Sequence, residues 1–73
     1  HVEWQDNRFA KRLATIYEQA NDLEQALHWT IAATRIDPYD PATHLKQAEL
    51  LTRLGRESES AKAREIGKLL EQR

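Results

Sequence analysis

The sequence predicts an all-α fold in which two antiparallel helix-turn-helix hairpins stack on each other. Apolar residues recur every three or four positions in four separate segments, as they do on one face of an α-helix. Turn-forming residues separate these segments at positions 21–22, 37–38 and 55. Small residues also stand where two helices would have to cross closely, at Ala14, Ala26 and Ala33.

The first helix is predicted from Arg8 to about Gln19. Its apolar side chains keep a spacing of three and four, which predicts one buried stripe along the helix. The members of this stripe are Phe9, Leu13, Ile16, Tyr17 and Ala20. A second stripe is polar and faces away from the first; it consists of Arg8, Lys11, Thr15 and Glu18.

A tight reversal and a second helix follow. Asn21 tolerates the left-handed conformation that ends a helix, and Asp22 is a good N-cap for the next one. The second helix is predicted from about Leu23 to Ile36 and is apolar around much of its girth, which favours a position between two neighbours. Asp37-Pro38 ends it, because the residue before a proline is pushed out of the helical region.

The second hairpin begins at Asp40-Pro41, where aspartate caps the helix and proline fits its first position. This third helix is predicted to run to about Leu54, and Gly55 ends it. The fourth helix is predicted from about Glu57 to Gln72. It is mostly charged, and its apolar side consists of Ser60, Ala63, Ile66, Gly67 and Leu70.

The two halves of the chain match each other at an offset of 34 residues. Residue size and turn chemistry agree at Ala14 and Ala48, Tyr17 and Leu51, Asn21 and Gly55, Ala26 and Ser60, Ala33 and Gly67, and Ile36 and Leu70. A period of 34 with small residues at the helix crossings is typical of tetratricopeptide repeats.

The segment 7–40 resembles that family at its signature offsets, which hold Leu13-Ala14, Tyr17, Ala20-Asn21, Ala26, Ala33 and Asp37-Pro38. Thr30 stands where the family usually has a large aromatic residue, and we expect Trp29 to take over that volume. The segment 41–73 resembles a second, less regular repeat whose last helix caps the array. The resemblance implies one domain, 1–73, in which residues 1–6 are a lead-in, and a right-handed α-solenoid fragment.

Composition and charge limit the classes of partner. The formal net charge is −1, from 11 basic and 12 acidic residues, which argues against attraction to nucleic acid or to an anionic membrane. No apolar run approaches the roughly 20 residues of a membrane span, and no signal-like segment opens the chain. The chain starts at His1 and contains no methionine, so we expect it to be a piece of a longer protein.

No group of side chains in the sequence points to catalysis. Cysteine is absent, so the chain has no thiol nucleophile and no cysteine zinc site. His1, His28 and His44 lack the spacing of a metal site, and His44 is expected to be a packed or interfacial ring. Gly55 and Gly67 do not form a phosphate-binding loop. We therefore expect no enzymatic activity, no cofactor and no metal.

In the tetratricopeptide family, the first helix of each repeat lines a concave groove that receives peptides or partner segments. The resemblance implies a groove here formed by Arg8, Lys11, Thr15, Glu18, Leu45, Lys46, Glu49, Thr52 and Arg53. Such a groove suits an extended, partly acidic segment. Some family members clamp the C-terminal carboxylate of heat-shock chaperones, but Thr15 and Lys46 stand where asparagines are needed, so we expect no such clamp. The alternative is that these are ordinary polar positions on a spacer.

The aromatic residues indicate a second surface. Trp29 is expected in the core, whereas Trp4 is expected to pack on the first helix or on a preceding element. Two repeats are usually too few to bury a continuous core. We therefore expect an apolar interface around Trp4, Phe9 and Trp29.

The favoured function is a non-catalytic protein–protein interaction module, one end of a larger protein, whose partner is a protein, a peptide or a neighbouring domain. The alternative is a structural element that self-associates as a homo-oligomer or braces an appended catalytic domain. Nucleic-acid binding is disfavoured by the charge balance and by a third helix without a basic run.

Overall fold

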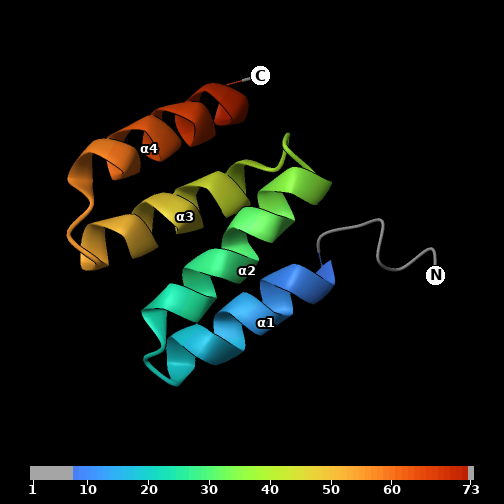
Figure 1. Cartoon of the computed structure of the whole chain (residues 1–73). Helices are drawn as coiled ribbons and strands as arrows, with labels where there is room; N and C mark the ends of the chain where they lie inside the picture. Colours follow the sequence, from blue (N-terminus) through green and yellow to red (C-terminus); the bar gives the residue numbers. More distant parts are fainter. Residues whose placement is uncertain (1–7, 73) are drawn as a thin grey trace.

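The structure is a computed structural model that describes residues 8–72 (Figure 1). This part of the chain is entirely helical apart from its turns, which confirms the predicted all-α class and the helical hairpins. The helices are α1 (Arg8–Gln19), α2 (Leu23–Ile36), α3 (Pro41–Arg53) and α4 (Glu57–Glu71). Trp4 lies outside the described residues.

The helix bounds follow from local capping chemistry. The Asp22 carboxylate accepts a hydrogen bond from the Gln25 amide at the start of α2. The Asp40 carboxylate accepts one from the Ala42 amide at the start of α3, where Pro41 occupies the first turn. No side-chain cap supports the start of α4.

The turns within the two hairpins have the same geometry. Asn21 and Gly55 both take a left-handed conformation, with φ of 65° and 82°. After each of them an amide reaches back to the preceding helix: Asp22 donates to the Tyr17 carbonyl and Arg56 to the Leu51 carbonyl, both at 2.8 Å. This is the Schellman pattern that ends many helices. Tyr17 and Leu51 therefore occupy equivalent places in the two hairpins.

The helices follow one another across the molecule in chain order, as Figure 1 shows. The helix α2 packs against both α1 and α3, and α3 also packs against α4. The Cα atoms span 36 × 33 × 14 Å, so the molecule is a thin slab and every helix keeps a face in water. None of the four described helices is long and apolar enough to cross a membrane.

The core lies mainly between α2, α3 and α4, and small residues make the close crossings. Its buried members are Ala26, Leu27, Ala48, Leu50, Leu51 and Ala63, with Tyr17, Leu23, Ile31 and Leu54 packed at the margin. The pairs Ala14 and Ala48, Ala26 and Ser60, and Ala33 and Gly67 are all buried. All six small residues are thus buried, and in the second hairpin Ser60 and Gly67 lie where α4 closely approaches α3.

The predicted buried stripe of the first helix is wrong at Phe9 and Ile16, whose side chains are 61% and 52% exposed, and at Ala20, which is also exposed. The helix α2 covers the neighbouring strip of α1 that carries Ala10 and Ala14, and these are the residues of α1 that are buried. Spacing correctly identified an apolar side of the helix. It did not show that only part of that side meets another described helix.

The expectation that Trp29 takes over the volume at Thr30 is also wrong. Thr30 itself is buried and donates its hydroxyl to the Ala26 carbonyl at 2.8 Å. Trp29 is half-buried at the margin of α2, where its ring meets Phe9 edge-on with centroids 6.3 Å apart. It also meets the ring of His28 at 5.3 Å. The side chain therefore belongs to an aromatic edge and not to the core.

Candidate protein-binding groove

The polar side chains predicted on α1 and α3 meet each other between these helices. We call this set of ion-paired residues, Lys11, Glu18, Asp40, Lys46 and Arg53, the α1–α3 seam. Glu18 accepts hydrogen bonds from Lys46 Nζ at 2.9 Å and from Arg53 Nη1 at 3.1 Å. Lys46 Nζ also donates to Glu49 at 3.4 Å. One carboxylate on the first hairpin is therefore shared by two cations on the second.

Lys11 forms the other end of the seam. Its ammonium group donates to the Asp40 carboxylate at 3.0 Å, so it contacts the residue that caps α3. Asp40 thus holds both the start of α3 and its side-chain link to α1. Both ends of the seam bind the first hairpin to the second.

The seam clearly shifts the pKa of one of its residues, Lys46. The hydrogen bond from Lys46 to Glu18 raises the pKa of Lys46 above its ordinary value, and the attraction of Glu18 and Glu49 acts in the same direction. Partial burial of the ammonium group opposes this effect. The seam therefore stabilises Lys46 as a cation.

A small cleft lies beside the seam. Its volume is about 140 Å³, and it is lined by Lys11, Ala14, Thr15, Thr30, Ala42, Thr43 and Lys46. Thr30 sits at the position where the resemblance leads one to expect a large aromatic side chain. Because the Trp29 ring contacts Phe9 and His28 instead, no described side chain fills the space next to Thr30.

A wider groove lies between α3 and α4. We call it the α3–α4 groove, and it is lined by Leu45, Glu49, Thr52, Arg53, Arg64 and Lys68. Arg53 is already bound to Glu18. Arg64 donates only to the hydroxyl oxygens of Thr52 and Ser60, both at 3.4 Å, and so keeps its charge uncompensated within residues 8–72. Lys68 makes no ion pair in the same part of the chain.

The floor of this groove is held by Ser60, a buried residue of α4. Its hydroxyl donates to the Ala48 carbonyl of α3 at 2.8 Å. Because the hydroxyl has one proton, Thr52, whose oxygen lies 2.6 Å away, must donate to Ser60. The two hydroxyls fix α4 against α3 and leave the Arg64 guanidinium beside them.

The predicted groove residues divide between these places. Lys11, Thr15 and Lys46 lie at the cleft, and Lys11, Glu18, Lys46 and Arg53 form the seam, with Glu49 bound to Lys46. Leu45, Glu49, Thr52 and Arg53 line the α3–α4 groove. Arg8 is exposed and lines neither pocket.

Sequence reasoning missed Arg64 and Lys68 as groove residues, because it recognised the fourth helix only as mostly charged. The 34-residue offset contained a usable signal. It aligns Arg64 with Thr30 and Lys68 with Thr34, two residues of α2 that are at least partly covered. Charges at these positions therefore had to face either another helix or an open groove.

Within residues 8–72, no three histidine, aspartate or glutamate side chains gather as potential metal ligands. The chemistry that the described surface offers is hydrogen bonding by guanidinium and ammonium groups next to an aliphatic side chain. Comparisons of the chain with protein-family models, with curated proteins and with solved structures gave no match.

Proposed function

We propose that the chain is a non-catalytic protein–protein interaction module of the tetratricopeptide-repeat kind. In this proposal, an extended acidic segment of a partner protein lies in the α3–α4 groove. The shared turn geometry of the two hairpins and the small residues at both helix crossings support the repeat assignment. The groove supports the binding function.

One observation carries the proposal: the cations of the molecule differ in whether they are already neutralised. Lys11 and Lys46 are bound to carboxylates of the seam, so a ligand would have to compete for them. Arg64 and Lys68 have no carboxylate partner within residues 8–72. An acidic side chain gains a charge-assisted hydrogen bond there without breaking an existing ion pair.

The position of Leu45 adds specificity. This half-buried side chain lines the groove and offers apolar contact next to the two cations. A segment in which acidic and aliphatic residues alternate matches this arrangement, because successive side chains of an extended chain point in opposite directions.

The test uses a fluorescent peptide of alternating glutamate and leucine, titrated with the whole chain and followed by anisotropy. The double variant Arg64→Gln/Lys68→Gln is expected to weaken binding about thirtyfold, since each of the two lost charge-assisted contacts contributes about 1 kcal/mol. The matched control is Arg35→Gln, which removes an exposed arginine of α2 that lines neither the cleft nor the groove. Equal binding by the double variant and the wild type would contradict the proposal, as would a peptide that does not bind.

A second candidate is a structural element that self-associates or braces a neighbouring domain. The exposed Phe9 and Ile16 favour it, because large apolar side chains in water often mark an interface. Light scattering over a concentration series separates the two functions. A monomer that binds the peptide supports the interaction module, and a concentration-dependent dimer that does not bind it supports the structural element.

A further inference from the structure

The exposed apolar side of α1 has a buried counterpart in the second hairpin. At the 34-residue offset, Phe9 corresponds to Thr43 and Ile16 to Leu50. Thr43 and Leu50 are 2% and 0% exposed, whereas Phe9 and Ile16 are 61% and 52% exposed. The same two helical positions are thus covered in α3 and open in α1. We call the open pair the Phe9–Ile16 face.

The helix that covers the counterpart is α2. On α3, the side that carries Ala48 faces α4, since the Ala48 carbonyl accepts a hydrogen bond from Ser60. Thr43 and Leu50 are seven residues apart and so share the other side of α3. Leu50 belongs to the core cluster that contains Ala26 and Leu27 of α2, and Thr43 lines the small cleft beside Thr30 of α2. An aliphatic helix in the place of α2 is therefore what completes such a face.

The charges repeat in the same way. The position of Arg12 corresponds to Lys46, which reaches from α3 to Glu18 on the first hairpin. Arg12 is exposed and has no ion-pair partner among residues 8–72. If a partner carboxylate lay next to α1 in the same way that Glu18 lies next to α3, it would face Arg12.

We propose that the Phe9–Ile16 face binds a helical hairpin of a partner, packed on α1 as the α1–α2 hairpin packs on α3. The partner places an aliphatic helix over Phe9 and Ile16, and the helix before it carries a carboxylate that pairs with Arg12. Because Phe9 is larger than Thr43, the partner helix has a small residue opposite Phe9. This surface is separate from the α3–α4 groove, and the inference does not depend on what that groove binds.

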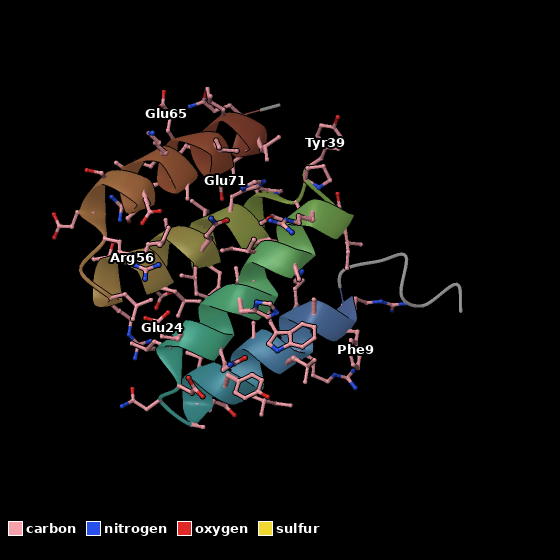
Figure 2. All side chains as sticks on the ribbon, in the orientation of Figure 1. Phe9, Glu24, Tyr39, Arg56, Glu65 and Glu71 are labelled. Carbon is pink, nitrogen blue, oxygen red and sulfur yellow. The ribbon has the colours of Figure 1, made fainter. Side chains whose placement is uncertain are left out.

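A second copy of the chain fits this face less well than such a hairpin does. At the 34-residue offset, the aliphatic residue Ile31 of α2 corresponds to Glu65 of α4, and Thr30 of α2 corresponds to Arg64. Glu65 and Arg64 are both exposed. Figure 2 shows Phe9 and Glu65 on opposite sides of the molecule. Head-to-tail stacking would bury these charges against Phe9 and Ile16, and face-to-face pairing would bring Arg12 of both copies together.

The experiment supplies a hairpin of the proposed chemistry. A copy of residues 7–40 is joined directly ahead of residue 7, which keeps the 34-residue period and places the copy's Glu18 within reach of the original Arg12. The tether gives the added hairpin a high effective concentration. The extended chain is expected to unfold in a single transition at a higher urea concentration than the original chain.

Three variants separate docking from general effects. In the original chain, Ile16→Ser is expected to change the unfolding equilibrium constant less than about threefold, because this side chain is exposed. The same change in the second unit of the extended chain is expected to raise the constant at least about tenfold, because the side chain is then covered. Arg12→Glu in that unit is expected to weaken docking, and Glu18→Lys in the added copy to restore it.

Two results would overturn the inference. One is an extended chain that is no more stable than the original, or in which Ile16→Ser has the same small effect in both settings. The other is an original chain that dimerises in light scattering and becomes monomeric on Ile16→Ser, since a second copy would then occupy the face. The double variant Arg64→Gln/Lys68→Gln is expected to weaken peptide binding in the α3–α4 groove and to leave docking of the added hairpin unchanged. Failure of the docking inference and failure of the proposed peptide binding can therefore be told apart.

Discussion

Lys46 of α3 donates a hydrogen bond from Nζ to the carboxylate of Glu18 on α1 at 2.9 Å, and this contact links the two hairpins across their polar side. The core joins the same hairpins through α2 and α3. The seam therefore adds a second, polar set of contacts to the apolar one.

The contribution of Lys46 to stability is expected to depend on pH at the alkaline end. Its pKa is raised in the folded chain, mainly by the hydrogen bond to Glu18. The stabilisation is therefore fully present below the unfolded value of about 10.4, and is lost as the pH rises through the higher folded value.

The measurement compares the wild type with Lys46→Met by urea unfolding between about pH 8 and pH 11. The difference in unfolding free energy is expected to be at most about 1 kcal/mol, because the Lys46 side chain is 38% exposed, and to shrink above about pH 10. A difference that grows with pH would show that Lys46 is not stabilised as a cation.

Removing Glu18 is expected to cost more than removing an ordinary surface carboxylate. Glu18→Gln leaves two cations, Lys46 and Arg53, without their shared acceptor and is expected to lower the free energy of unfolding by about 1 kcal/mol. Glu24→Gln is the matched control. Glu24 faces Arg56 between the two hairpin turns (Figure 2), at a longer distance of 3.8 Å and in a more exposed setting. Equal losses for the two variants would show that sharing the carboxylate adds nothing.

The left-handed turn at Gly55 predicts an order of stability among its variants. Its φ is 82°, and no atom outside Gly55 and its two chain neighbours lies within 4 Å of where a Cβ would be, so only backbone strain opposes substitution. Gly55→Ala is expected to lower the free energy of unfolding by about 1–2 kcal/mol. Gly55→Asn is expected to cost less, because Asn21 adopts the same conformation in the first hairpin. Urea unfolding of both variants checks this order, and an alanine variant as stable as the asparagine variant would contradict it.

The helices were predictable because the signals that bound them are local. Asp22 and Asp40 cap the helices that directly follow them, and Asn21 and Gly55 end the helices that directly precede them. These interactions span a few residues, so they can be recognised without knowledge of the fold. The repeat offset was readable for the same reason, since each hairpin carries its own turn and its own small residues.

The site was less predictable because it depends on contacts between residues far apart in the chain. The exposure of Phe9 and Ile16 depends on which side of α1 meets α2, and their spacing alone cannot show this. The link from Glu18 to Lys46 spans 28 positions and forms only when the two hairpins cross at the observed place. The polar stripe was therefore recognised as a surface, but its internal ion pairs were not.

The last prediction concerns Gly67, where α4 closely approaches α3. A Cβ at this position would lie 2.7 Å from Leu45 Cδ2, 2.8 Å from Leu45 Cγ and 3.3 Å from the Pro41 carbonyl oxygen. Alanine improves helix propensity by up to about 1 kcal/mol, but overpacking costs about 1–3 kcal/mol. Gly67→Ala is therefore expected to lower the free energy of unfolding by about 1 kcal/mol.

A double-mutant cycle assigns this loss to Leu45. In the background of Leu45→Ala the clashing atoms are gone, so Gly67→Ala is expected to be neutral or stabilising there. The coupling between the two substitutions should then be about 1 kcal/mol in favour of the double variant. Additive effects would mean that the Pro41 carbonyl, and not the Leu45 side chain, limits how closely α4 approaches α3. The same variants bear on the groove, because Leu45 lines it: if Gly67→Ala displaces this side chain, peptide affinity changes along with stability.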